Sequence, residues 1–192
     1  MGTKARQTQA LLLKTAKQLF LERGYGGTKI EHITEACGIS RAGFYTYFPS
    51  KRDLFLALGE TTYRDHKAVL DKFDELPDPC TTEDLKGWVG AYFELMDEHG
   101  AFMLGAAQTS PNDEDLKAMS RTKTMKMGRK LGKSIRARQA STRGDEAALG
   151  LTVMAMLDHT WYYAGERHPI DEDALLDTAV EVLARLLHVA RG

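Results

Sequence analysis

Apolar residues recur at intervals of three and four along almost the whole chain, which is the period of an amphipathic α-helix. The first apolar stripe contains Leu12, Ala16, Leu19 and Phe20 and ends before Gly24. No stretch alternates apolar and polar residues as a half-buried strand would. The pattern therefore predicts an all-α protein of about nine helices, at residues 6–23, 28–37, 40–48, 50–73, 83–98, 101–109, 113–138, 145–165 and 171–190.

Residues that begin or end helices separate these stretches. Every proline lies where a helix is expected to begin or end, and none interrupts an apolar stripe. Thr28 and Glu31 have the spacing of a capping box at the start of the second helix. Ser40 and Ser50 can cap the third and fourth helices. These signals predict a head of three helices followed by a longer helical body.

Two short helices joined at Gly38 predict a helix-turn-helix within this head. Glycine supplies the tight backbone that the turn needs. Apolar positions on both sides of the turn would fix the angle between the two helices, and the second helix could then lie in the major groove of DNA. These inward positions are Ile33, Cys37, Ile39, Phe44 and Tyr47.

The net charge of −1 conceals an uneven distribution of charged residues. Residues 1–52 contain nine Lys and Arg but only three Asp and Glu, whereas the remainder contains 17 basic and 24 acidic residues. A basic head on an acidic body suits binding of the head to a polyanion, which the body would repel. The charge pattern therefore agrees with DNA binding by the head.

The segment from Leu19 to Phe55 resembles the TetR family of transcriptional regulators, whose pattern is roughly LF-x-E-x-GY-x-x-T and then I-A-x-x-AGVS-x-G-x-LY-x-YF-x-SK-x-x-L. It departs from this pattern at Thr34, Ala42 and Phe44. The resemblance implies a helix-turn-helix DNA-binding domain over residues 1–52 and a ligand-sensing and dimerisation domain over residues 53–192. The chain matches the pattern in one ungapped register at Leu19, Phe20, Glu22, Gly24, Tyr25, Thr28, Ile33, Ala36, Gly38, Ser40, Tyr45, Tyr47, Phe48, Ser50, Lys51 and Leu54.

The resemblance also implies which residues contact DNA. Arg41 is expected to pair with the O6 and N7 atoms of a guanine. Lys51 is expected to bind a phosphate, because it lies in the first turn of a helix whose free N–H groups favour an anion. The expected base-facing residues are Arg41, Ala42, Gly43 and Tyr45, and the expected phosphate contacts are Thr28, Lys29, Thr46, Tyr47 and Lys51.

The last two predicted helices carry broad apolar faces, and in the family such helices form a four-helix dimer bundle. A homodimer would suit a palindromic operator, because two heads must reach major grooves about 34–36 Å apart. Burial of these faces within one subunit is the alternative. The residues concerned are Leu149, Leu151, Met154, Ala155, Leu157, Trp161, Leu175, Leu176, Ala179, Val180, Leu183, Leu186 and Leu187.

Large, soft side chains in the body suggest an effector site, since ligand sites are mainly apolar with a few polar groups. Asp158 and His159 interrupt an apolar run and could bind a polar group of a ligand; a satisfied polar pair or a place at the dimer seam is equally compatible. Plain core packing is the alternative for the apolar members. The expected effector residues are Phe93, Met96, Phe102, Met103, Met125, Met154, Asp158, His159 and Tyr162.

Residues 117–138 carry nine basic side chains. They form either a solvated helix face or a strip that holds a phosphate-bearing ligand such as an acyl-CoA. The strip consists of Lys117, Arg121, Lys123, Lys126, Arg129, Lys130, Lys133, Arg136 and Arg138.

No Ser-His-Asp arrangement, glycine-rich phosphate loop, HExxH motif or paired-cysteine spacing appears, so neither an enzyme nor a cofactor or metal is expected. No apolar run approaches the roughly 20 residues of a membrane span, and the N-terminus has no signal-like apolar core, which favours a cytoplasmic protein without a membrane partner. The sequence therefore predicts a DNA-binding transcriptional repressor that a small, largely apolar effector releases from its operator. The alternative is a TetR-like DNA-binding protein controlled by a protein partner.

Overall fold

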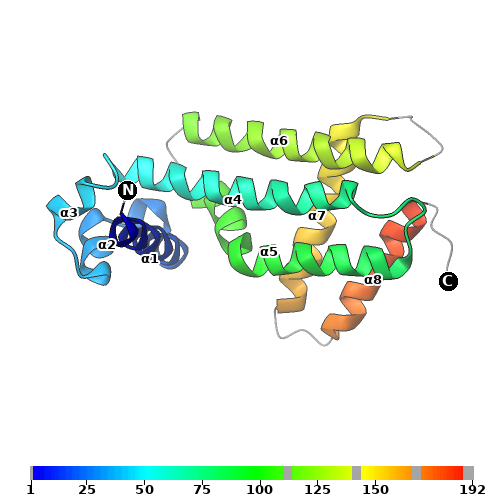
Figure 1. Cartoon of the computed structure of the whole chain (residues 1–192), viewed down its shortest axis with the longest axis horizontal. Coiled ribbons are helices and arrows are strands. Elements are labelled where there is room, and N and C mark those ends of the chain that lie inside the picture. Colours follow the sequence, from blue (N-terminus) through cyan, green and yellow to red (C-terminus); the bar gives the residue numbers. More distant parts are fainter. Residues whose placement is uncertain (1, 110–113, 140–143, 166–169, 188–192) are drawn as a thin grey trace. The chain divides into compact units, whose positions relative to one another are not determined.

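The computed structural model describes residues 2–109, 114–139, 144–165 and 170–187 (Figure 1). These residues form helices only, which confirms the predicted all-α class. None of the described helices combines the length and the apolar character needed to cross a bilayer. The helices are α1 (Thr3–Gly27), α2 (Ile30–Cys37), α3 (Arg41–Tyr45), α4 (Lys51–Asp74), α5 (Thr82–Thr109), α6 (Glu114–Ala137), α7 (Glu146–Gly165) and α8 (Glu172–Leu186).

The described residues hold eight helices rather than nine, because the helices predicted at 83–98 and 101–109 are one continuous helix, α5. Gly100 lies between the two predicted segments. In the structure Gly100 is a contact point, since a Cβ atom at this position would lie 2.7 Å from the indole ring of Trp161. The glycine therefore admits a bulky neighbour from α7 and does not end the helix.

The chain divides into two compact units. Unit 1 comprises residues 1–64 and 101–117, and unit 2 comprises residues 65–100 and 118–192. Residues of α4, α5 and α6 belong to both units. The functional division at residues 52 and 53 stays a prediction.

The core of unit 1 joins the three head helices to the first half of α4. Phe55 of α4 contacts the rings of Phe20, Tyr25 and Phe102, with ring centroids 4.9–5.4 Å apart. The buried members of this core are Leu12, Ala16, Leu19, Phe20, Ile33, Phe44, Phe48, Leu54, Phe55, Leu58, Phe102 and Leu116. Burial of this apolar surface is the main force that holds the head together.

The core of unit 2 is built around the aromatic residues of α5. Trp88 packs edge-on against Phe73 of α4, and its indole N–H donates to the Val69 carbonyl oxygen at 2.9 Å. On α6 and α7, glycines allow very close backbone approach: a Cβ atom on Gly132 would lie 1.7 Å from the carbonyl oxygen of Glu146. Within this unit the end of α4 lies between α5 and α6 (Figure 1).

Candidate functional site

The helix-turn-helix depends on the backbone of Gly38. This residue adopts φ 64° and ψ 32°, a left-handed conformation that favours glycine. Its N–H donates to the Glu35 carbonyl oxygen, and the N–H of Ile39 donates to the Thr34 carbonyl oxygen, which ends α2. Ile33 and Phe44 are fully buried on the two sides of the turn, as the sequence predicted. The turn and its inward residues therefore fix α3 against α2.

A second set of bonds positions the start of α2. The hydroxyl of Thr28 donates to the carbonyl oxygens of Leu19 and Gly24, at 3.0 and 2.8 Å, and the residue is fully buried. The predicted capping box of Thr28 and Glu31 is wrong by one residue, because Lys29 is the N-cap. The N–H of Lys29 donates to Nδ1 of His32 at 3.2 Å.

The burial of Thr28 also corrects its expected role. A side chain that is 0% exposed and bonded to α1 cannot reach a phosphate from this conformation. Thr28 instead positions the backbone of its neighbour Lys29, whose own side chain is exposed.

The outward face of α3 is small and accessible. Ser40 caps this helix by accepting the N–H of Gly43 at 3.0 Å. Phe44 and Phe48 point into the core, whereas Gly43 and Tyr47 are half-buried. The exposed residues of this helix and its C-cap are Arg41, Ala42, Tyr45 and Thr46, and we call them the α3 face.

Arg41 is held in place by a residue of α2 and by Tyr45. Its guanidinium forms an ion pair with the carboxylate of Glu31 on α2. It also donates to the hydroxyl of Tyr45 at 3.4 Å and lies 6.0 Å from the centroid of that ring. Because both charged side chains are largely exposed, the pair is weak and Arg41 can exchange Glu31 for another acceptor.

Lys51 connects the start of α4 to the backbone around α2. Its ammonium donates to the carbonyl oxygens of Tyr25 and Thr28, at 2.7 and 2.8 Å, and lies 4.2 Å from the centroid of the Tyr25 ring. Partial burial lowers the pKa of Lys51. An ammonium has three N–H donors, so these two bonds leave one for a further acceptor.

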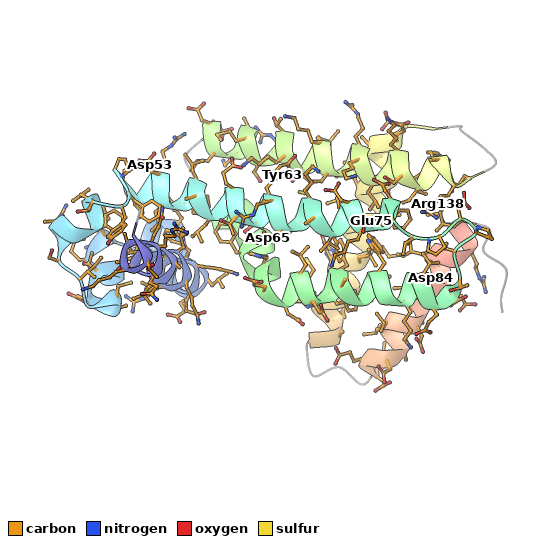
Figure 2. All side chains as sticks on the ribbon, in the orientation of Figure 1. Asp53, Tyr63, Asp65, Glu75, Asp84 and Arg138 are labelled. Atoms are coloured by element: carbon orange, nitrogen blue, oxygen red, sulfur yellow. The ribbon has the colours of Figure 1, made fainter. Side chains whose placement is uncertain are left out.

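Unit 2 contains a group of polar side chains, which we call the buried polar cluster: the buried His66 of α4, the buried Tyr92 and His99 of α5, and the half-buried Asp158 of α7. The Tyr92 hydroxyl donates to Oδ1 of Asp158 at 2.7 Å. The ring of His66 lies edge-on to that of Tyr92, with centroids 5.3 Å apart. Nε2 of His99 lies 3.2 Å from Oδ2 of Asp65 on α4 (Figure 2).

His66 differs from the other members of this cluster. It is 0% exposed, yet neither of its ring nitrogens has a hydrogen-bond partner in the described part of the chain. Burial, with a smaller contribution from nearby His99, lowers the pKa of His66 to about 4. Burial raises the pKa of Asp158 and, together with that carboxyl group, the pKa of Tyr92. The interior of this unit therefore disfavours charge and leaves one imidazole unsatisfied.

Comparison with known proteins connects these features to a family. Residues 12–58, which run from α1 into α4, match the model described as bacterial regulatory proteins, tetR family. The chain is 26% identical over 178 residues to the HTH-type transcriptional regulator EthR of Mycobacterium tuberculosis, across 89% of this chain and 82% of EthR. The chain therefore resembles the TetR family of transcriptional regulators along most of its length. The matched segment contains the helix-turn-helix, the part of the chain that resembles a DNA-binding domain.

Two further relatives show how far the likeness extends. Over 53 residues the chain is 40% identical to the HTH-type transcriptional regulator YuxN of Bacillus subtilis. The matched stretch makes up 28% of this chain but only 18% of YuxN. A transcriptional regulator from Aquifex aeolicus VF5 shares the fold, with a TM-score of 0.74 at 18% identity over 93% of this chain and 99% of that one. Sequence likeness to YuxN is therefore local, whereas the TetR-family fold extends along nearly the whole chain.

The structure separates the nine residues that the sequence proposed for the effector site. Phe93, Met96 and Met154 are buried in unit 2, where Asp158 binds Tyr92. Met103 is half-buried and, like Phe102, belongs to unit 1. The apolar and polar members are therefore not a single group.

Four of these assignments need correction. Phe102 packs against Phe55 in the core of unit 1, because α5 continues past residue 100 into that unit. Met125, His159 and Tyr162 are exposed on the single chain, so they do not lie in its interior.

Sequence reasoning missed His66, Tyr92 and His99. The sequence does hold a signal for His66, which is spaced three and four residues before the buried Val69 and Leu70 and therefore shares their helix face. The polar residues immediately beside it hid this spacing.

Part of the basic strip, on α6 and just beyond its end, forms bonds within unit 2. Lys130 forms ion pairs with Asp71 and Asp74, each at 2.8 Å. Arg138 donates to the carbonyl oxygens of Leu76 and Pro77, at 2.6 and 2.7 Å, beyond the end of α4 (Figure 2). Lys126, Arg129 and Lys133 remain exposed, so the strip has both bonded and solvated members.

α7 packs against α8, and their inward residues include Leu157 and Leu183, both 0% exposed. Other apolar side chains of these helices remain accessible on the single chain. Tyr162, Tyr163 and Val182 are each 45–47% exposed. An outer apolar surface of this kind is available for contact with a second copy.

Proposed function

We propose that this chain is a TetR-family repressor that binds a palindromic operator as a homodimer and leaves it when a small, largely apolar effector binds in unit 2. The observation that carries the effector part is the buried, unsatisfied imidazole of His66 beside Tyr92 and Asp158. Buried polar groups almost always have a partner, and those without one call for an explanation. An effector that supplies the partner would explain this one.

DNA reading is assigned to the α3 face. Arg41 is the group that can pair with a guanine, while Ala42 leaves room for the helix to approach the base edges. The hydroxyls of the exposed Thr46 and the half-buried Tyr47 are assigned to the backbone of the DNA, and Gly43 to close approach of the helix. Lys29 and Lys51 supply positive charge for phosphates, which determines affinity more than sequence preference.

Dimerisation is assigned to the outer surface of α7 and α8. The exposed Tyr162, Tyr163 and Val182 give this surface an apolar character that contact with a second copy would bury. A symmetric pair of heads would bind a symmetric operator. When the operator overlaps a promoter, the bound dimer excludes polymerase.

The test begins with selection of operator DNA from a random pool by the full chain. A palindromic consensus with two half-sites is expected. Compounds are then screened for release of that operator by fluorescence anisotropy, and binders are checked by thermal shift without DNA. Coupling between ligand and DNA sites typically changes affinity about 5- to 150-fold.

A reporter gene placed behind the selected operator then measures regulation. Expression should be low with the protein present and should rise when a releasing compound is added. If a diverse panel releases no operator and a lysate fraction does, control by a protein partner replaces the effector. If expression rises when the protein binds, the repressor assignment is wrong.

A further inference from the structure

We infer that the effector of this chain is an uncharged molecule whose apolar body carries a hydroxyl or carbonyl group, and that this group hydrogen-bonds to the imidazole of His66. This inference rests on the proposed effector control and specifies its chemistry. In the buried polar cluster, every side chain except His66 has a polar partner close by.

The other members of the cluster each lie within hydrogen-bond or ion-pair distance of a polar side chain. Tyr92 donates to Asp158 at 2.7 Å, so this hydroxyl and this carboxylate oxygen are already used. His99 lies 3.2 Å from the carboxylate of Asp65. The ring of His66 lies edge-on to the Tyr92 ring, and both of its nitrogens are buried without a bond among the described residues.

The imidazole of His66 is suited to an uncharged partner. A neutral imidazole carries one N–H donor and one acceptor nitrogen, and it can exchange their places by changing tautomer. It can therefore accept from a hydroxyl or donate to a carbonyl. The lowered pKa of His66 keeps the ring in this neutral form at physiological pH.

The same surroundings disfavour charged ligands. Among the described residues, the titratable groups at or next to the cluster are Tyr92, Glu98 and His99 of α5, Asp158 and His159 of α7 and the neighbouring Asp65 of α4. None of these groups is a permanent cation that could pair with a carboxylate ligand, and the two aspartates would repel one. An ammonium ligand would lose its hydration to reach a carboxylate that Tyr92 already binds.

Apolar side chains of the same unit are available to surround such a molecule. Phe93 and Met96 follow Tyr92 on α5, and Met154 lies one helical turn before Asp158 on α7; all three are buried. Methionine side chains adapt to varied shapes, so these residues can repack around a bound molecule.

The experiment uses twelve compounds: an octyl, an ethylphenyl and a naphthyl body, each with a hydroxyl, a carboxylate, an ammonium or no polar group. Binding to the full-length protein is measured by calorimetry and thermal shift. At least one hydroxyl compound should bind roughly tenfold or more tightly than its counterpart without a polar group. The carboxylate and ammonium counterparts should bind more weakly than the hydroxyl compound.

Two variants of His66 test whether this residue causes the preference for a hydroxyl group. His66→Leu removes an unsatisfied buried polar group, so it should fold, and it should lose the preference for hydroxyl. His66→Asn keeps a donor and an acceptor and should retain part of the preference. His159→Leu, on the exposed side of α7 beside Asp158, is the matched control and should bind as the unaltered protein does.

Several results would overturn the inference. These are tightest binding by a charged compound, an unchanged hydroxyl preference in His66→Leu, and failure of all twelve compounds to bind. The proposed function fails separately, when a diverse panel releases no operator. A charged compound that releases operator equally from His66→Leu would refute the inference and leave the proposed function standing.

Discussion

The close approach of α6 and α7 can be tested by the substitution Gly132→Ala. In Gly132→Ala, the added Cβ would lie 1.7 Å from the carbonyl oxygen of Glu146, 2.6 Å from its carbonyl carbon and 3.0 Å from the nitrogen of Gly150. Ordinary carbon–oxygen contacts begin at about 3.3 Å, so the two helices must separate by roughly 1.5 Å. All three neighbours are backbone atoms, which cannot turn aside as a flexible side chain can.

The expected cost follows from two opposing effects. Overpacking typically costs about 1–3 kcal/mol and sometimes more, and backbone-to-backbone overlap belongs at the upper end of this range. Replacing a helical glycine by alanine returns about 1 kcal/mol through the lower conformational entropy of the unfolded chain. The net loss of folding free energy should be about 2 kcal/mol or more, which lowers the melting temperature by roughly 4–8 °C in a chain of this size.

Gly87→Ala on α5 is the matched control. Gly87 is exposed, and a Cβ there would meet nothing within 4 Å. This variant should gain about 0.5–1 kcal/mol, since only the entropy term acts. Urea unfolding at a fixed protomer concentration measures both variants, because the stability of a dimer depends on concentration. Equal stability of the two variants would refute the proposed helix approach.

Three further predictions concern the DNA and effector sites. Arg41→Ala should relax the preference at one base pair of each half-site without changing the salt dependence of binding, and an unchanged consensus after operator selection would remove Arg41 from the reading surface. Lys51→Ala should weaken binding to all sequences and reduce the slope of log K against log salt by about one; a lower melting temperature with the same slope would limit Lys51 to its bonds with the Tyr25 and Thr28 carbonyls. The pKa of His66 falls from 6.5 to about 4 on folding, so the folded state resists protonation, and the stability due to the neutral ring should be lost as the pH falls from 6.5 towards 4. The loss is up to about 3 kcal/mol, and urea unfolding of His66→Leu should lack this component.

The helix-turn-helix could be predicted from sequence because its determinants are local. Gly38 closes a turn whose apolar flanks, Ile33 and Phe44, are only 11 residues apart along the chain. Helix propensity, capping and the left-handed glycine all act within this span. The resemblance to the family adds to the same local signal.

The body was harder to predict because its determinants are distant in sequence. Gly100 resembles a helix end until Trp161, 61 residues later, packs against it. His66 resembles a surface histidine until Tyr92 and the rest of unit 2 enclose it. Apolar periodicity showed that Phe102 is buried but not which unit it belongs to, since periodicity gives the face of a helix and not the neighbour that covers it.

The bonds that support α2 and α3 have a consequence for how operator recognition changes during evolution or engineering. Thr28 donates to the carbonyl oxygens of Leu19 and Gly24, and Lys51 donates to those of Tyr25 and Thr28. A carbonyl oxygen is present whatever side chain its residue carries, so these supports place no demand on the residues that face outward from α3. The exposed positions 41, 42, 45 and 46 can therefore be exchanged as a cassette from another regulator while the scaffold beneath keeps its geometry. The same backbone framework of the head can therefore carry different outward-facing side chains, and with them different operator preferences.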